Sequence, residues 1–327
     1  MNIIDKLPAV GLAAGLALAV TSVAQAKDVV VAHYCALLQG APWSVALEQD
    51  MFAKAGVDID GIIPARGGGD TVRNALANDV PYGEAGLGAV LAARAKGAPL
   101  KVIHAAVSGK VDMYWLVRMD SPIQSIKDMP GKKMGITNPN SGSDQLTRQV
   151  LQAAGMSVDD VTIVTTGGLR EGLTLLGQGE IDTMPAIEPI VTQLAAKFRP
   201  VFAVGDFVPT MTQTVGFTTE AFAKAEPDML RKVIAARRQA VEAIYADPKA
   251  AAAMIAKRCE MKPELTAAVI EKFAGWRYWS TGGFDRAGLE ANVAGLKLIG
   301  ALKADESVDW SAVIDQSLLP EDLRKPL

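Results

Sequence analysis

The sequence predicts an α/β fold made of two lobes, and three observations lead to this prediction. Short apolar runs rich in β-branched residues alternate with helical patterns through the first two thirds of the chain, which is typical of α/β units with mainly parallel sheets. From Glu226 to Ala304 the pattern is mostly helical. The segments 76–103 and 175–204 share one order, namely helix end, polar turn, short strand, helix and strand. That order indicates two lobes on one plan, although any two α/β units share it at this level of detail.

Five short apolar runs are predicted as strands: Asp28–Tyr34, Leu100–Val107, Met113–Met119, Val161–Thr166 and Pro200–Val204. Helices are predicted over Pro42–Ala55 and Ser143–Ala154, because each pattern ends at a glycine that suits a helix C-terminus. Pro248 and Pro263 lie where later helices are expected to begin. We expect these late helices, and the aromatic patch at 275–284, to pack around one lobe and not to form a third domain.

The first 26 residues have the pattern of a secretory signal that is removed after export. Lys6 lies in a short polar start, Gly11–Val20 forms the apolar core, and Ala24–Ala26 supplies small residues for cleavage. The apolar run is shorter than the roughly 20 residues that a membrane span needs. We therefore expect cleavage near Ala26, a periplasmic mature chain, and no lipid anchor, since Cys35 follows too late.

Composition argues against several classes of function. The chain has 33 basic and 36 acidic residues and a net charge of -3, so no nucleic-acid partner is expected. Two histidines and two cysteines are too few for a metal site or for Cys–His catalysis. His33 and His104 both lie in apolar runs, as core histidines do, and no GxSxG or HExxH motif is present. We expect a protein that is not an enzyme and that needs no cofactor.

Cys35 and Cys259 are compatible with one disulfide in an oxidising compartment. Their wide separation in the sequence carries no information about their distance in space. We expect them to be unpaired, with Cys35 in a loop and Cys259 packed against a helix.

Five blocks of the sequence, in order, resemble the periplasmic substrate-binding proteins of the nitrate/sulfonate/taurine type of ABC importer, which include the thiamine-precursor binders. The blocks are APWSVALEQDMFAKAGVDID, ALANDVPYGEAGLGAVLAARAKGAPLKVI, SPIQSIKDMPGKKMGIT, LLGQGEIDTMPAIEP and IYADPKAAAAMIAK. One departure is that Asn78 and Pro81 stand where the family has a Gly and Asp pattern like that of Gly179–Asp182.

The resemblance implies the two-lobed periplasmic-binding-protein fold with two hinge crossovers and a ligand held between the lobes. On that plan residues 1–26 are the signal, residues 27–114 and 211–327 form lobe one, and residues 115–210 form lobe two. It also implies a monomer that captures a small polar ligand and delivers it to an ABC permease with its ATPase. Two alternatives stay open, an enzyme on the same scaffold and a ligand-sensing partner of a membrane receptor. Thiamine-pyrimidine synthases resemble this fold too, but this sequence lacks their cysteine-rich iron motif.

Three ligand-binding places are predicted in lobe one, because ligands of open α/β sheets bind at the carboxyl ends of strands. After the first strand, Tyr34 and Trp43 are expected to form an aromatic wall and Gln39 to hydrogen-bond the ligand, unless Trp43 only packs a helix start. The remaining candidates are Arg66, Gly68 and Gly69 in the triple-glycine loop, and Leu87 and Gly88 at the next helix start.

Glycine permits close backbone approach, so amides in the triple-glycine loop are expected to face an anion. Asp70 and Thr71 follow where a nucleotide loop needs Lys and Ser or Thr, which excludes nucleotide binding. The alternatives are a plain flexible turn for this loop and helix–sheet packing for Leu87 and Gly88. We expect Gly68→Val to abolish ligand binding and to leave the fold largely intact.

The fourth place lies in lobe two, before the helix predicted over Ser143–Ala154. Its candidates are Asn138, Ser141, Gly142 and Ser143, whose hydroxyls and amides suit an anionic head group, although serine is also an ordinary helix cap. By resemblance, Glu188 faces the same cleft and suits a ligand donor, as does Glu84. A zwitterionic or mixed ligand would satisfy both sets of groups.

Overall fold

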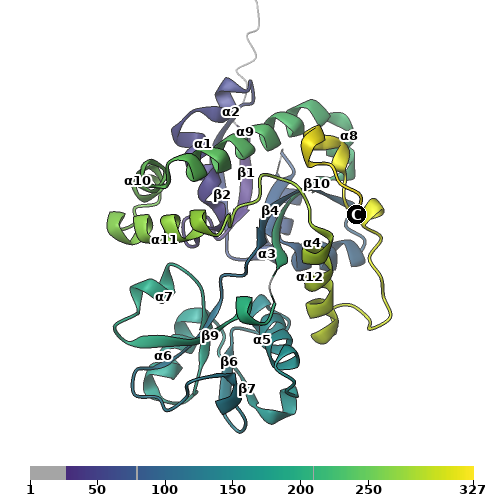
Figure 1. Ribbon diagram of the computed structural model, residues 1–327. Coiled ribbons are helices and arrows are strands. Elements are labelled where there is room, and N and C mark those ends of the chain that lie inside the picture. Colours follow the sequence, from purple (N-terminus) through teal and green to yellow (C-terminus); the bar gives the residue numbers. More distant parts are fainter. Residues whose placement is uncertain (1–26, 79, 209) are drawn as a thin grey trace, which may run out of the picture.

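The computed structural model describes residues 27–78, 80–208 and 210–327, which form two lobes (Figure 1). Lobe one contains a five-stranded sheet in the order β2-β1-β3-β10-β4. Its strands are β1 (Lys27–Ala32), β2 (Ile59–Ala65), β3 (Tyr82–Gly86), β4 (Leu100–Gly109) and β10 (Met211–Thr219). β1 runs parallel to β2 and β3, whereas β10 is antiparallel to β3 and β4. The predicted secretory signal lies outside the described residues.

Lobe two contains the five strands between β4 and β10. They are β5 (Tyr114–Arg118), β6 (Lys133–Ile136), β7 (Thr162–Thr165), β8 (Met184–Ala186) and β9 (Phe198–Ala203). β8, β5 and β9 form one sheet and β6 and β7 another, and a parallel bridge between Met134 and Thr183 joins them. Tyr114, predicted as the end of the first part of lobe one, begins β5 and pairs with Ala186 and Ala203.

Two chain segments connect the lobes. Crossover one is residues 110–113, between β4 and β5, and crossover two is residues 204–210, between β9 and β10.

Helices cover both lobes. Those of lobe one are α1 (Ala41–Glu48), α2 (Met51–Lys54), α3 (Gly68–Leu76), α4 (Leu87–Ala95), α8 (Glu220–Ala225), α9 (Pro227–Ala246), α10 (Pro248–Arg258), α11 (Pro263–Gly275), α12 (Arg286–Leu298) and α13 (Trp310–Val313). Those of lobe two are α5 (Gly142–Ala153), α6 (Leu169–Gln178) and α7 (Ile190–Gln193). Short 3₁₀ helices are Leu38–Gly40, Ile126–Asp128, Val158–Asp160, Val204–Asp206, Gln316–Leu318 and Glu321–Leu323.

The predicted α/β class is confirmed, as are the helix starts at Pro248 and Pro263. The five predicted strands correspond to β1, β4, β5, β7 and β9. The late helices contribute to one continuous apolar core with the lobe-one sheet, as expected. The helix predicted over Pro42–Ala55 is wrong in one respect, because it breaks at Asp50, whose backbone is left-handed with a φ of 53°. His33 lies just beyond β1, also with a left-handed backbone, and is not a core strand residue.

The prediction of unpaired cysteines is wrong, because Cys35 and Cys259 form a disulfide. α10 packs against α1, which brings the last turn of α10 beside the loop after β1. The side chains next to the bridge also pair, since the Arg258 Nε donates to the Tyr34 hydroxyl at 3.1 Å. The loop after β1 is therefore fixed to α10 both covalently and by hydrogen bonding.

Candidate functional site

The strand registers bring the carboxyl ends of the strands in both lobes toward the crossovers. In lobe one, Gly86 at the end of β3 pairs with Thr214 near the start of β10, so the ends of the parallel strands lie beside crossover two. In lobe two, Ala186 at the end of β8 pairs with Tyr114 at the start of β5. β6 and β7 run parallel to each other, and β6 parallel to β8, so their ends lie on the same edge.

Loops at the carboxyl ends of parallel strands are the usual ligand positions in α/β sheets. We call residues 33–40, 66–69 and 86–88 the lobe-one edge, and residues 137–143, 166–169 and 187–189 the lobe-two edge. Twelve of the thirteen predicted ligand residues fall on these two edges, and Trp43 lies just beyond them in α1.

The triple-glycine loop begins α3, and its three glycines differ in surroundings. Gly67 is the N-cap, with an extended backbone and no side-chain cap. A Cβ on Gly68 would overlap the Cβ of Ala89, so this glycine allows α3 and α4 to pack closely. Gly69 is exposed, and a Cβ there would meet only the tip of Arg73 at 3.5 Å. The expectation that Gly68→Val keeps the fold intact therefore conflicts with the packing of these two helices.

Charges at the start of α3 partly cancel. The Arg66 side chain is 96% exposed and pairs with Asp70 at 3.6 Å, and Asp70 also pairs with Arg73. His33 lies nearby, because its Nε2 is 4.0 Å from the position of a Cβ on Gly67. Burial lowers the pKa of His33, which keeps this ring neutral over a wider pH range. His33 was not among the ligand residues predicted from the sequence, because it was assigned to a buried strand.

The backbone N–H groups at the start of α4 have no side-chain cap and no acidic side chain beside them in the first turn. The N-cap of α4 is Gly86. The Leu87 side chain is fully buried, and a Cβ on Gly88 would approach Leu296 of α12 to 2.9 Å. These two residues therefore reach the lobe-one edge only through their N–H groups, which carry the partial positive charge of a helix start.

Three hydroxyl groups cluster at the start of α5 on the lobe-two edge. Ser141 lies 2.8 Å from Ser143, and Thr137 lies within 3.0 Å of both, measured between hydroxyl oxygens. Ser141 also caps α5 by accepting a hydrogen bond from the Asp144 N–H. The capping alternative is thus confirmed for Ser141. Asn138 and Gly142, which flank this cluster in the sequence, are both exposed.

A second glycine-capped helix start lies on the lobe-two edge and was missed in the sequence. Gly168 caps α6 with φ 177° and ψ 169°, close to the φ 170° and ψ 174° of Gly67 at the start of α3. Both helices carry an acidic residue in the first turn, Asp70 in α3 and Glu171 in α6. The segment TGGLREGLTLL follows a strand and has paired glycines before a helical pattern, as RGGGDTVRNAL does. This similarity could have identified the helix start at Gly168 from the sequence.

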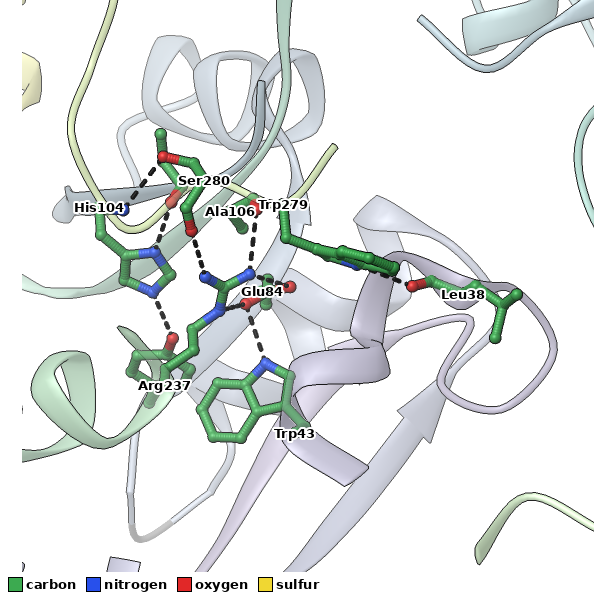
Figure 2. Close-up of polar contacts among 11 residues, drawn as sticks. Leu38, Trp43, Glu84, His104, Ala106, Arg237, Trp279 and Ser280 are labelled. Carbon is green, nitrogen blue, oxygen red and sulfur yellow. Dashed lines mark hydrogen bonds and ion pairs between the residues drawn. The ribbon is translucent and has the colours of Figure 1, made fainter. Parts of the chain in front are cut away.

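Two acidic residues predicted to face a ligand are occupied by protein donors. Glu188 is buried, and its carboxylate accepts hydrogen bonds from the Lys272 Nζ at 2.6 Å and from Thr192. Glu84 is buried within lobe one and pairs with Arg237 (Figure 2). Neither carboxylate is free for a ligand in this structure, because tertiary partners that are remote in the sequence satisfy both.

Trp43 does not form an aromatic wall, and this prediction is wrong. Its side chain is fully buried, and the indole N–H donates to Glu84 Oε2 at 2.9 Å (Figure 2). The alternative that Trp43 packs a helix start is confirmed. The aromatic patch at 275–284 is also packing, since Tyr278 and Trp279 are buried and the Trp279 indole donates to the Leu38 carbonyl.

Tyr34 and Gln39 remain on the lobe-one edge, where Tyr34 is half-buried. The Tyr34 hydroxyl pairs with Ser44 at 3.0 Å, and the Gln39 side chain hydrogen-bonds to Tyr278. Both side chains are thus held in place by lobe one.

Charged and aromatic side chains that were not predicted from the sequence form a cluster at crossover one. Asp112 is buried, and its Oδ2 accepts a hydrogen bond from the Glu188 N–H at 2.9 Å. Burial raises the pKa of Asp112 to about 7. The Lys272 Nζ lies 4.7 Å from the ring centre of Tyr114 and 5.0 Å from that of Trp276. Glu188 and Lys272 join the two lobes through one ion pair.

Two surface hollows lie away from both edges. One, of about 560 Å³, is bounded by Arg118 and Phe198 in lobe two, and another, of about 350 Å³, is bounded by Tyr245 and Arg277 in lobe one. Within the described residues, no group of three His, Cys, Asp or Glu side chains is placed to hold a metal ion. None of the described helices is long and apolar enough to span a membrane.

Residues 38–251 match the protein family described as NMT1/THI5 like. No match was found among curated proteins. The chain is similar to the periplasmic aliphatic sulphonate binding protein SsuA from Escherichia coli, with 17% identity, a TM-score of 0.71, and coverage of 89% of this chain and 92% of that one.

Two further solved structures share this architecture. The alkanesulfonate-binding protein SsuA from Xanthomonas axonopodis pv. citri, bound to MOPS, is 18% identical with a TM-score of 0.66 and covers 84% of this chain and 93% of its own. The desulfurization enzyme DSZB is 17% identical with a TM-score of 0.63, and the similarity covers 89% of this chain and 97% of DSZB. These similarities show that the chain has the two-lobed periplasmic-binding-protein fold.

Proposed function

The chain belongs to the NMT1/THI5-like family, and from this premise and the geometry of the two edges we propose that it is an extracytoplasmic solute-binding protein. It captures a small polar organic ligand, anionic or zwitterionic, between the lobes. It then delivers the ligand to an ABC permease with its ATPase. The protein acts as a monomer without a cofactor, and its secretory signal is removed near Ala26.

The observation that carries this proposal is the convergence of strand ends from both lobes beside the crossovers. The start of α4 brings uncapped N–H groups to the lobe-one edge, and Thr137, Ser141 and Ser143 bring hydroxyl groups to the lobe-two edge. Donors of these two kinds suit a carboxylate or sulfonate oxygen. Arg66, Gly68, Gly69, Asn138 and Gly142 extend the same donor surface.

The neighbouring structures support an organic anion as the ligand. Two of them are named as sulfonate-binding proteins. We therefore place sulfonates first among the ligand classes, followed by carboxylates and zwitterions.

Ligand bound to one edge recruits the other by bending at crossovers one and two, with lobe boundaries near residues 114 and 210. Closure is favoured only as far as the ligand binds the closed form more tightly than the open form. The closed form is the one that docks on the permease.

An enzyme on the same scaffold is the second candidate, and DSZB shows that this fold can carry enzymatic activity. Two features of this chain argue against it. The described part of the chain has no free thiol, since Cys35 and Cys259 are bridged. His104 is fully buried, and its ring is held by Tyr82 and by the Ala105 carbonyl.

A thermal-shift screen of alkanesulfonates, amino acids, amides, pyrimidines and aromatic acids tests the proposal. At about 100 times its Kd a ligand stabilises the folded state by about 2.7 kcal/mol, which gives a measurable rise in Tm. Ser141→Ala should weaken the best ligand by about tenfold, the effect of one lost hydrogen bond to a charged group. Ser157→Ala is the matched control, because Ser157 also caps a helix of lobe two but lies away from the edge.

The proposal predicts a rise in Tm with at least one class of ligand, and a smaller rise in Ser141→Ala than in Ser157→Ala. No rise with any class, or equal losses in both variants, would contradict binding at the lobe-two edge.

A further inference from the structure

Asp112 has a carboxylate oxygen that nothing in the described structure satisfies. It lies on crossover one, and only 3% of the residue is exposed. Its Oδ2 accepts a hydrogen bond from the Glu188 N–H, whereas Oδ1 is buried and has no hydrogen-bond partner among the described residues. A buried acceptor without a partner costs about 1–3 kcal/mol, so an arrangement of this kind calls for an explanation.

The other buried carboxylates differ from Asp112 in this respect. Glu84 receives hydrogen bonds from Arg237 and Trp43, and Glu188 receives them from Lys272 and Thr192. Asp144 is held by Arg148 on one oxygen and by a backbone N–H on the other. The donor-binding role that the sequence suggested for Glu84 and Glu188 is thus left to a different acid.

Asp112 lies where the two edges meet. Its hydrogen bond reaches Glu188 on the lobe-two edge. Asp112 also acts on Tyr278 of lobe one: burial raises the pKa of Tyr278, and the nearby charge of Asp112 raises it further. The Tyr278 hydroxyl is hydrogen-bonded to Gln39 of the lobe-one edge. Asp112 therefore lies between Glu188 of the lobe-two edge and Tyr278, the side chain that Gln39 of the lobe-one edge contacts.

The surroundings of Asp112 are aromatic and nearly neutral in total charge. Tyr114 and Trp276 receive the Lys272 ammonium on their rings, and Lys110 lies 4.6 Å from the ring centre of Trp276. Lys272 balances the charge of Glu188 through their ion pair. Such a site tolerates a ligand with or without a net positive charge at that end, provided that it supplies a hydrogen-bond donor.

We propose that Asp112 is a specificity-determining residue of the interlobe site and that its Oδ1 accepts a hydrogen bond from an ammonium, amine or amide N–H of the ligand. This inference rests on the proposed function, and it narrows the ligand class. The ligand carries an anionic end for the starts of α4 and α5 and an N–H donor for crossover one.

The test compares ligands that differ only in the donor. The probe pairs are 2-aminoethanesulfonate and ethanesulfonate, β-alanine and propionate, and 4-aminobenzoate and 4-methylbenzoate. Titration calorimetry is run on the full mature chain, on Asp112→Asn, and on Asp206→Asn. Asn keeps an oxygen for the Glu188 N–H but turns the free end of the side chain into a donor. Asp206 is an exposed acid on crossover two and gives the same chemical change outside the site.

The proposal predicts that the wild-type protein binds the amino member of at least one pair about tenfold or more tightly than its partner. Asp112→Asn should remove this preference and change the affinity for the amino-free member by less than about threefold. Asp206→Asn should retain the preference.

Two results overturn the inference while leaving the proposed function in place. One is equal binding of both members of every pair that binds. The other is an equal loss of affinity for both members of a pair in Asp112→Asn, which means that Oδ1 is hydrogen-bonded to water or has a structural role. If the wild-type protein binds neither member of any pair, the proposed function fails for these ligand classes, and the inference fails with it.

Discussion

Removing the cation from the buried Glu84–Arg237 pair should destabilise lobe one strongly. Both side chains are 2% exposed, and the Arg237 Nε donates to Glu84 Oε2 at 2.7 Å. Arg237 also donates to the carbonyls of Ala106 and Ser280, so it ties β4 and the loop before α12 to α9 (Figure 2). Breaking a buried pair by deleting one partner costs about 3–5 kcal/mol, and we expect Arg237→Met to fall in this range.

A second substitution separates the charge effect from the loss of packing. In Glu84→Gln/Arg237→Met both charges are removed, and the new amide side chain still offers an oxygen to the Trp43 indole. This double variant should be more stable than Arg237→Met by about 1–2 kcal/mol. Arg231→Met is the control on the same helix, because Arg231 pairs with Asp228 at the surface, where a pair contributes less than about 1 kcal/mol.

Urea unfolding, followed in parallel by tryptophan fluorescence and circular dichroism, measures these differences. Two results would contradict this prediction: Arg237→Met destabilises the protein no more than Arg231→Met, or the double variant is no more stable than Arg237→Met. Either result would mean that the carboxylate is not held as a buried charge by Arg237.

Three further predictions concern single features. Replacing Cys35 and Cys259 by serine should lower the free energy of unfolding by about 2–5 kcal/mol, because the bridge closes a loop of 224 positions; no change in urea midpoint would contradict this. Burial raises the pKa of Asp112 to about 7, so the contribution of this carboxyl to the free energy of unfolding of the wild-type protein falls as the pH rises toward and past 7. From about pH 5 to about pH 8, Asp112→Asn should therefore gain about 3 kcal/mol relative to wild type in urea unfolding, and a constant difference would exclude the raised pKa. Gly68→Val should lower the Tm because its side chain overlaps α4, whereas Gly69→Ala should keep or raise it; equal melting temperatures would argue against that packing.

Local sequence patterns were sufficient for much of the fold but not for every strand. β1 and β4 are continuous apolar runs, and the helices α10 and α11 begin at prolines, so each could be predicted from its own residues. β3 reads YGEAG and β8 reads MPA, and neither has a strand-like composition. These two segments are strands because β1, β10 and β5 pair with them, which is tertiary information.

The candidate site divides in the same way. The helix starts at Gly68 and Gly142 were found because glycine and serine mark such starts locally. The roles of Trp43 and Glu84, which bond to each other, were misjudged because Arg237, the buried partner of Glu84, lies 153 positions further along the chain. Asp112 was missed because a single acid in a crossover has no sequence motif, and only the arrangement of the lobes buries it.

On the proposed function, a ligand is held between the two lobes and draws them together. Small-angle scattering of the mature chain, with and without the ligand that gives the largest rise in Tm, measures this closure. We expect a smaller radius of gyration at saturation, because bending at crossovers one and two brings the lobe-one and lobe-two edges together. A radius that stays the same while calorimetry shows the site to be full would contradict it.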